Sequence, residues 1–403
     1  MTASRTPPMS SRPPLWRDAR IIRIVGQAAA LLVLFLLLRW LGSNLATNLA
    51  RQNLGTDFGF LNRPTQFAIP YFPDFDSRSP VWNMVLVGVK NTFLAGFVGI
   101  ILATVVGLIV GISRLSPNWL LARLATGFVE TFRNIPPLVV IIFFGAAIFT
   151  FGPLPILREG IEVRLPGTEN NLLILSNDQW GIPSLVGGDA VWPYLGLLAG
   201  GLVLAVGLWI WRTRVNVRTG DPHHRVLWSF GAFVVVAAIG YLLLGEPFQI
   251  SWPTLTETRR RFETGFAMNF GFMALTFALG LYTASHIAEI FRGSILAVPS
   301  GQTEAASALA LSGFQRYRFV VLPQALRIAL PPTINQYLNL VKNTSLGVAV
   351  AYAEITALTQ TSIGNGRPAV QSIVILMAVY LMFSLVISLI LNQVNRRFQL
   401  VVR

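Results

Sequence analysis

The sequence contains no cysteine and only two lysines, Lys90 and Lys342. Without cysteine there is no disulfide, no thiolate metal site and no thiol nucleophile. Both lysines follow a valine, so neither belongs to a Gly-Lys-Ser/Thr loop that cradles the phosphates of ATP. The HExxH and GxSxG patterns of metal-dependent and serine hydrolases are absent as well. If the function of this chain needs ATP, another subunit must bind it.

Charged residues are scarce, at 12% of the chain, whereas 53% of the residues are hydrophobic. Soluble domains carry about a quarter charged residues, so this chain lacks the polar surface that water requires. The net charge of +14 does not indicate nucleic-acid binding, because the basic residues are distributed between apolar runs rather than gathered in one domain. The composition therefore predicts a protein that lies in a lipid bilayer.

Several apolar runs are close to the roughly 20 residues that a helix needs to cross the hydrocarbon core. Helices are expected, because every backbone polar group in lipid must be satisfied within the protein. The runs lie at about 24–41, 85–112, 135–151, 191–211, 227–244, 266–285, 326–350 and 369–391. We predict an all-α membrane protein with about eight transmembrane helices.

The second run carries a stripe of small residues at a spacing of four. The stripe consists of Gly99, Ala103, Gly107 and Gly111. Small residues on one helix face let another helix approach closely, either within the chain or from a partner chain. Packing within the chain is the favoured interpretation.

The distribution of arginine predicts the orientation. With the N-terminus inside the cell, the cytoplasmic segments hold most of the arginines, and the outer loops hold more acidic than basic residues. This agrees with the excess of positive residues on the cytoplasmic side of membrane proteins. The first run resembles the apolar part of a cleaved signal peptide, but Arg39 and Trp40 at its end favour a retained helix. We predict a multi-pass protein of the bacterial inner membrane with both termini in the cytoplasm.

A short helix is predicted on the cytoplasmic side, over residues 304–312. Thr303 can cap its N-terminus, Glu304 in its first turn complements the helix dipole, and Gly313 can end it. Its apolar surface is formed by alanines and leucines that include Ala305, Ala306 and Leu309. An exposed helix of this kind is expected to bind in a groove of a partner protein.

The same segment resembles a known motif. Glu304-Ala305-Ala306, followed by Gly313 and by Val321-Leu322-Pro323, resembles the EAA loop of ABC importer permeases. The flanking segments resemble the polar amino-acid (histidine/glutamine-type) family of these permeases, and most of all the Q-type membrane subunit of general L-amino-acid permeases. These segments are Val129–Leu138, Glu289–Gly293, Leu322–Arg327 and Lys342–Leu346. The resemblance covers residues 85–151 and 266–395.

The resemblance implies a transport subunit rather than an enzyme. The short helix would couple the chain to an ATPase subunit, and the residues implied in this coupling loop are Glu304, Ala305, Ala306, Leu309, Gly313 and Pro323. The chain would pair with a second permease subunit, a different chain, and with two ABC ATPases and a periplasmic amino-acid-binding protein. It would import a broad range of polar L-amino acids without binding a cofactor or metal itself, since the partner ATPases would use the ATP.

The chain also departs from the usual five-span core of this family, because it has an additional N-terminal helix and a long insertion. The predicted organisation has five parts. They are a disordered cytoplasmic tail (1–20), an N-terminal transmembrane helix with a periplasmic loop (21–84), the first part of the permease core (85–151), an inserted periplasmic loop and helical hairpin (152–265), and the second part of the core with the coupling loop (266–403).

Lys342, Asn343 and Thr344 are candidates for the substrate pathway, since they lie at the end of an apolar run. A charge at membrane depth usually faces a cavity or a partner. Lys342 could therefore bind a substrate carboxylate or pair with Glu354 or Glu289. A lysine that extends to the membrane interface explains the pattern equally well.

Asn134 is a further pathway candidate, because Pro136 and Pro137 predict a break in the helix directly after it. Broken helices line the binding sites of many transporters. The alternative is an ordinary helix start with proline in its first turn. Just upstream, Glu130 and Arg133 are one turn apart and are expected to form a local ion pair.

Two other classes of protein remain as alternatives. An ion-coupled secondary amino-acid transporter would work without an ATPase and predicts paired acidic residues within the spans, but the acids here lie mostly in loops. A membrane enzyme such as a lipid-linked transferase would need a catalytic constellation of His, Asp or Cys residues, and none is recognisable in the sequence.

Overall fold

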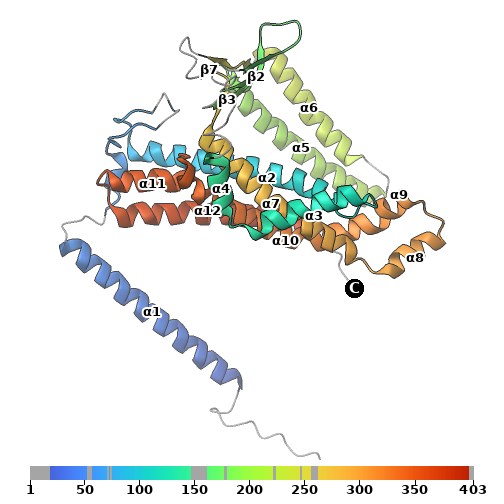
Figure 1. Cartoon of the computed structure of the whole chain (residues 1–403), viewed down its shortest axis with the longest axis horizontal. Coiled ribbons are helices and arrows are strands. Elements are labelled where there is room, and N and C mark those ends of the chain that lie inside the picture. The colour runs from blue at the N-terminus through green and yellow to red at the C-terminus, as the bar shows by residue number, and fades with distance from the viewer. Residues whose placement is uncertain are drawn as a thin grey trace, which may run out of the picture.

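The computed structural model describes residues 19–51, 57–69, 72, 75–146, 161–176, 179–220, 224–245, 247–255 and 262–398. The tail predicted over residues 1–20 lies almost wholly outside the described residues. The helices, shown in Figure 1, are α1 (Ala19–Arg51), α2 (Val81–Ser113), α3 (Trp119–Asn134), α4 (Pro137–Phe143), α5 (Val191–Thr219), α6 (Arg225–Leu244), α7 (Phe270–Leu296), α8 (Ser300–Ala308), α9 (Gly313–Arg316), α10 (Leu322–Asn343), α11 (Ile355–Gly364) and α12 (Ala369–Phe398). Shorter helical segments are η1 (Gly59–Asn62), η4 (Tyr317–Val321) and η5 (Thr344–Val350).

Six helices of the described residues are long and apolar enough to cross a membrane. The spanning segments are Ile22–Asn48, Val81–Ser113, Val191–Thr219, Arg225–Leu244, Phe270–Leu296 and Ala369–Gln393. A bent pair, Trp119–Asn134 with Pro137–Ala146, would make a seventh span. The run predicted at 326–350 is divided between α10 and the 3-10 segment η5. The helical membrane fold is thus confirmed, with a number of spans close to the predicted one.

Helix α7 is the centre of the bundle and packs against α2, α3, α4 and α10. Of its most apolar stretch, 72% is buried inside the protein. Helix α7 can approach α2 closely because α2 has glycine at the points of contact. A Cβ atom on Gly107 would lie 2.7 Å from Cγ2 of Ile287, and one on Gly111 would lie 2.9 Å from the carbonyl oxygen of Ala288. The other two members of the small-residue stripe are buried too. The stripe therefore serves packing within the chain, as expected.

The insertion and the four residues that follow it contain short strands that the sequence analysis did not predict. A four-stranded antiparallel sheet has the order β1-β2-β3-β8, and β4 pairs with β5 and β6 with β7. The strands are β1 (Ile161–Arg164), β2 (Asn171–Leu175), β3 (Gln179–Ile182), β4 (Ser184–Gly187), β5 (Phe248–Ser251), β6 (Thr254–Leu255), β7 (Phe262–Thr264) and β8 (Phe266–Asn269). Segments this short give too few residues for a periodic pattern.

Strand β8 connects the insertion directly to the bundle, because α7 begins at the next residue. The side chain of Asn269 caps α7 by accepting a hydrogen bond from the backbone N–H of Phe272 at 2.8 Å. Asparagine at this position satisfies one of the amide groups that a helix start leaves unpaired. Strand β8 and the central helix α7 are therefore one continuous segment.

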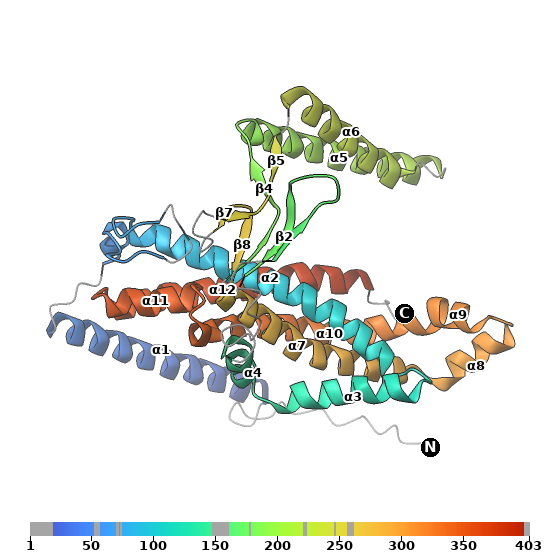
Figure 2. The ribbon, with the colours of Figure 1, turned by 45° about the horizontal axis from the view of Figure 1, so that its top comes forward.

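Helices α5 and α6 form a hairpin within the insertion, where the sequence predicts one. They pack on each other through glycines, since a Cβ atom on Gly201 would lie 2.9 Å from Cγ1 of Val236. Figure 2 shows this hairpin apart from the bundle that contains α2, α7 and α10. Only 17% of the apolar stretch of α5 and 11% of that of α6 are buried.

Candidate functional site

The predicted cytoplasmic helix exists as α8, at the end of the bundle where α7 ends and α10 begins (Figure 1). It has nine residues but starts earlier than expected, with Pro299 at the N-cap position. Thr303 is inside the helix, where its hydroxyl donates to the carbonyl oxygen of Ser300 at 2.7 Å. The prediction that Thr303 caps the helix is therefore wrong, because the extended backbone of Pro299 already begins it.

The end of α8 also differs from the prediction. The helix ends at Ala308, and Ala310 adopts a left-handed backbone with φ of 52°. Gly313 is the first residue of α9, where Ser312 and Gln315 form a reciprocal capping box. The role of Gly313 as the residue that ends the helix is thus wrong. In this structure it begins α9, the short helix that starts the return segment to α10.

The loop around α8 exposes apolar side chains. Leu309 is 75% exposed and Phe314 is 72% exposed, although both lie beyond the membrane-spanning part of α7. Glu304 and Ala305 are exposed, whereas Ala306 is buried. Pro323 is half-buried in the first turn of α10. We call the segment 300–316 the α8–α9 tip; its apolar surface is the kind that a partner covers.

The predicted helix break lies between α3 and α4. Helix α3 ends at Asn134, α4 begins at Pro137, and the two axes are bent by 107°. Pro136 and Pro137 occupy the N-cap and first positions of α4, where proline is favoured. The Asn134 side chain stays on α3 and donates from Nδ2 to the carbonyl oxygen of Glu130 at 2.8 Å.

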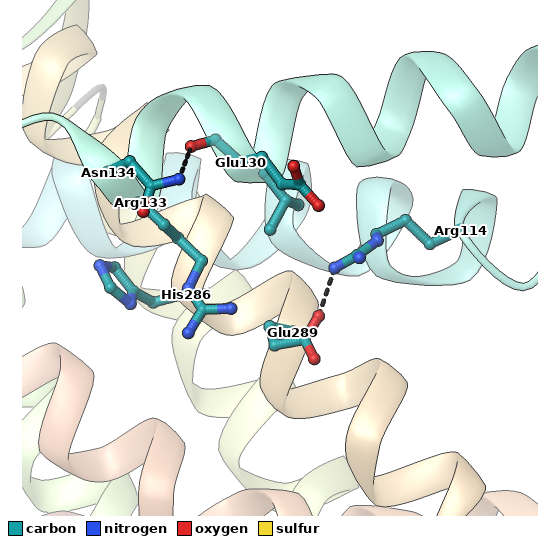
Figure 3. A pocket seen from close by; sticks show the side chains of 7 residues that line it. Arg114, Glu130, Arg133, Asn134, His286 and Glu289 are labelled. Carbon is teal, nitrogen blue, oxygen red and sulfur yellow. Dashed lines mark hydrogen bonds and ion pairs between the residues drawn. The ribbon is translucent and has the colours of Figure 1, made fainter.

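A polar cavity of about 440 Å³ lies beside this break, between α3, α7 and the end of α2 (Figure 3). Its lining residues are Arg114, Val129, Glu130, Arg133, Asn134, His286 and Glu289. Six of the seven are polar or charged, and they come from segments as far apart in the sequence as Arg114 and Glu289. The volume falls in the range of roughly 300–1,000 Å³ typical of small-molecule sites. We call it the α3–α7 pocket.

Two of the pocket residues, Glu289 and Arg114, belong to an ion cluster whose third member, Arg292, does not line the pocket. Glu289 is paired with Arg114 through Oε2, and Oε1 accepts from Nη2 of Arg292 at 2.6 Å. Nε of Arg292 also donates to Oε2 at 3.1 Å. Both carboxylate oxygens of Glu289 thus have cationic partners. Because Arg114 follows α2 and the other two residues belong to α7, the cluster connects the ends of these helices.

The other pocket residues lack such partners. No ion pair joins Glu130 and Arg133 in the part of the chain that the structure describes, so the predicted pair is wrong. Nε2 of His286 is buried without a hydrogen-bond partner, while its ring lies edge-on to Tyr282. In Figure 3, Arg133 extends from α3 toward α7 beside His286.

The segment 342–344 lies at the junction of α10 and η5, and none of its residues lines the pocket. Lys342 is exposed and Asn343 is half-buried, whereas the Thr344 side chain is fully buried and donates to the carbonyl oxygen of Val341 at 2.7 Å. Glu354 is also fully buried and caps α11. The predicted pairing of Lys342 with Glu354 or Glu289 is therefore wrong.

The buried carboxylate of Glu354 is satisfied by hydrogen-bond donors close to it rather than by Lys342. Its carboxylate accepts from the backbone N–H groups of Thr356 at 2.9 Å and Ala357 at 2.8 Å, and from the hydroxyl of Tyr380 at 2.9 Å. These donors satisfy a buried carboxylate at a helix start without a cation. Lys342 stays available on the surface of α10.

Comparison with known proteins identifies the family. The chain is 36% identical over 393 residues to the general L-amino acid transport system permease protein AapQ of Rhizobium johnstonii, which covers 96% of this chain and 94% of that protein. It belongs to the amino-acid ABC transporter permeases. The family described as "Binding-protein-dependent transport system inner membrane component" matches residues 225–400.

Two further relatives match this ABC permease over almost their full length. The Escherichia coli K12 permease protein YhdX, whose name assigns it to an amino-acid ABC transporter, is 36% identical over 90% of this chain and 91% of that protein. The glutamate/glutamine/aspartate/asparagine transport system permease protein BztB of Rhodobacter capsulatus is 33% identical over 95% of each chain. The predicted resemblance to the Q-type subunits is therefore confirmed.

Family membership decides between the functional classes. The chain is a membrane-embedded transport subunit and not an enzyme, and the ATPase of the complex is a separate subunit. Membership of the ABC permease family supports the hypothesis of an ATP-driven importer over that of an ion-coupled secondary transporter. The permease works in a complex with ATPase and permease subunits.

The α3–α7 pocket was not recognised from the sequence. Glu289 and Arg292 are three residues apart on one helix, which is a recognisable spacing for an ion pair. Arg114, however, is 175 residues away from Glu289, and no local pattern connects them. In the described residues, no group of three or more His, Cys, Asp or Glu residues could hold a metal ion.

Proposed function

We propose that this permease is one of two different membrane subunits of an importer of polar L-amino acids. Two ABC ATPases would bind and hydrolyse ATP, and a periplasmic binding protein would deliver the amino acid, while this chain binds no cofactor. The observation that carries the substrate class is similarity over nearly the full length to permeases that are named for amino-acid transport.

The α8–α9 tip is the proposed docking site for an ATPase subunit. Its exposed apolar side chains, Leu309 and Phe314, suit a groove on a partner protein. The tip contains Glu304, Ala305, Ala306 and Gly313, and Pro323 lies in the first turn of α10, the helix that returns from the tip. Since α8 follows α7 after three residues, a movement of the tip would be passed to the centre of the bundle.

We place the tip in the cytoplasm of a bacterial cell, with the protein in the inner membrane and both termini on the same side as the tip. This orientation rests on the distribution of arginine. The outer strands of the insertion would then face the periplasm and receive the binding protein. The substrate path would pass Asn134 at the α3–α4 break and the segment Lys342–Thr344.

Uptake measurements test the proposal directly. In cells that lack this chain, and in which redundant amino-acid systems are removed, we expect uptake of several radiolabelled polar L-amino acids to be lost. Expression of the wild-type chain should restore uptake, and an ATPase should co-purify with it. Unchanged uptake across the panel would overturn the amino-acid assignment.

A matched pair of substitutions tests the docking site. Leu309→Asp places a charge on the apolar tip and should abolish both co-purification of the ATPase and uptake, because a buried unpaired charge opposes binding. Leu185 in β4 is similarly exposed, at 73% against 75% for Leu309, but lies in the insertion. Leu185→Asp should leave the ATPase bound. Equal retention of the ATPase by both variants would contradict docking at the tip.

A further inference from the structure

One end of the α5–α6 hairpin is strongly basic. Between residues 209 and 228 the sequence has one acidic residue, Asp221, which lies outside the described residues. The same stretch has four arginines, Arg212, Arg214, Arg218 and Arg225. The ion pairs within the described part of the chain include none of these four. This basic end, where the chain turns from α5 to α6, therefore has an excess of positive charge.

Two of the arginines lie on tryptophan rings of the opposite helix. Arg212 of α5 lies over Trp228 of α6, with its guanidinium carbon 4.5 Å from the ring centroid. Arg225 of α6 lies over Trp209 of α5 at 5.4 Å. In each helix the arginine and the tryptophan are three residues apart, which places them on the same face. The two helices thus hold each other's cations at one level of the contact between them.

These ring contacts fix the two cations without using their hydrogen bonds. A tryptophan face attracts a guanidinium through the ring quadrupole, whereas the N–H groups of the guanidinium need oxygen acceptors. Nε of Arg212 is buried and has no hydrogen-bond partner, although buried polar atoms are nearly always satisfied. An anion with several acceptor oxygens is therefore the complementary ligand.

The length of α6 places the arginine pair at the level of the lipid phosphates. Helix α6 has 20 residues and begins at Arg225. A helix of this length spans roughly 30 Å, the thickness of the hydrocarbon core. Strand β5 follows the other end of α6, so the basic end lies on the opposite side of the membrane from this strand. Exposed tryptophans such as Trp211 are typical of that level.

The figures show which side of the membrane this is. In both views the basic end of the hairpin points toward the end of the molecule that carries α8 and α9 (Figures 1 and 2). In the orientation proposed above, this is the cytoplasmic side. The cytoplasmic leaflet is rich in anionic lipids, which attract basic segments close to its surface.

Apolar side chains beside the arginine pair are exposed. Leu227 and Phe230, on either side of Trp228 in α6, are 69% and 66% exposed. Only 11% of the apolar stretch of α6 is buried inside the protein. Such a surface is complementary to acyl chains, and the neighbouring cations are complementary to a phosphate. A phospholipid presents both groups in one molecule.

We propose that the basic end of the α5–α6 hairpin is a binding site for an anionic phospholipid of the cytoplasmic leaflet. Arg212 and Arg225 bind the phosphate, and the acyl chains lie along Leu227 and Phe230. Arginine suits a phosphate because its planar guanidinium donates two parallel hydrogen bonds. A zwitterionic headgroup binds more weakly, since the same arginines repel its choline or ammonium group. The lipid anchors the hairpin and is not part of the substrate path, so the site does not depend on which substrate is carried.

Hydrogen exchange of the purified complex of this chain with its partner permease and ATPases tests the proposal. Dioleoylphosphatidylglycerol is titrated into the complex in a neutral detergent, and amide exchange is followed in the last two turns of α5. The concentration at which exchange is half slowed gives an apparent Kd. Dioleoylphosphatidylcholine, which has the same acyl chains, should slow exchange only at much higher concentration. Inorganic phosphate should not compete, because it lacks the acyl chains.

Paired substitutions test the two arginines. Arg212→Gln/Arg225→Gln removes both cations and should raise the apparent Kd for phosphatidylglycerol about thirtyfold, since each arginine near the surface contributes to the attraction. Arg212→Lys/Arg225→Lys keeps both charges and should still prefer phosphatidylglycerol to phosphatidylcholine. The apparent Kd depends on how exchange changes with lipid concentration, so a faster exchange of the lipid-free variant does not imitate the effect.

A charge-matched control separates the site from the overall charge of the membrane surface. Arg23 in α1 and Arg123 in α3 are exposed arginines on the same predicted side of the membrane. Arg23→Gln/Arg123→Gln removes as much charge as the hairpin substitution and should leave the apparent Kd at the wild-type value. Elution of each complex as a single species in size-exclusion chromatography confirms its assembly.

The possible results decide the proposal. A rise in Kd for the hairpin variant alone supports the lipid site. An equal rise in both glutamine variants, or no rise in either, overturns it. If phosphatidylglycerol has no effect on the wild type and the hairpin variant loses the partner permease or an ATPase, the basic end is a protein contact and the lipid site is overturned. Uptake is measured separately, and its absence overturns the import function without affecting the lipid result.

Discussion

Helix α7 and the two helices of the α5–α6 hairpin are each long enough to cross a membrane, but they differ in how much protein surrounds them. Helix α7 has 72% of its apolar stretch buried, against 17% for α5 and 11% for α6. The hairpin is also the more hydrophobic of the two, since Phe270–Leu296 has a mean hydropathy of 1.3 and Arg225–Leu244 one of 2.2. The most apolar helices are therefore not the best buried ones.

The difference shows that lipid and protein place different demands on a spanning helix. A helix in lipid needs apolar side chains over its whole surface, whereas a helix inside a bundle needs small residues where its neighbours approach. Helix α7 can also carry polar residues such as His286 and Glu289, because protein surrounds them. Helix α7 has the contacts needed to pass a movement of the α8–α9 tip to other helices, because it packs against α2, α3, α4 and α10.

The largest expected effect is a clash between α2 and α7. Gly107→Leu places a side chain where Cγ2 of Ile287 would be 2.7 Å from the new Cβ, and overpacking of this kind costs roughly 1–3 kcal/mol. In α5, by contrast, Gly207 has no atom within 4 Å of an added Cβ. Gly207→Leu should therefore change stability by less than about 0.5 kcal/mol.

Thermal unfolding of the two purified variants, together with uptake, measures this contrast. Gly107→Leu should lower Tm and reduce uptake, and Gly207→Leu should do neither. If both variants are equally stable and active, the packing at Gly107 between α2 and α7 is no tighter than the open surface at Gly207, and the contrast is contradicted.

A smaller effect is expected from the ion cluster. Glu289→Gln leaves the side chains of Arg114, 13% exposed, and Arg292, 30% exposed, without their shared carboxylate. We expect a loss of about 1–2 kcal/mol, since partial exposure weakens the pair by solvent screening. The control is Glu162→Gln in β1, whose partner Arg164 is 60% exposed, and it should cost less than about 1 kcal/mol. A larger destabilisation by the control, measured by thermal unfolding, would contradict the role of the cluster.

The smallest effect is expected within the hairpin. Arg212 lies over the rings of Trp228, at 4.5 Å from the centroid, and Trp211, at 5.2 Å. Arg212→Gln removes these contacts at a cost of about 0.5–1 kcal/mol, and Arg212→Lys keeps the cation. Hydrogen exchange should become faster in α5 and α6 of the glutamine variant, while uptake stays at the wild-type level. A strong loss of uptake would show that the hairpin is mechanically joined to the bundle after all.

The bounds of α8 show where local sequence rules reach their limit. The sequence predicts the helix and its length. Thr303 is a residue type that can cap a helix and Gly313 one that can end it, but the helix neither starts at Thr303 nor ends at Gly313. Pro299, whose fixed backbone favours a helix start, precedes both. Several residues in this segment could begin or end a helix, and packing against η4 selects among them.

The sequence by itself determines the membrane location, most spans, the α3–α4 break and the family. These features depend on composition, runs of neighbouring residues and motifs of fixed spacing, which are local properties of the chain. Only the tertiary structure decides that Arg114 meets Glu289, that Lys342 has neither predicted partner, and that Arg133 and Glu130 are left unpaired at a cavity. Such contacts join residues far apart in the sequence, and side-chain charge alone does not specify which residues the packed helices bring together.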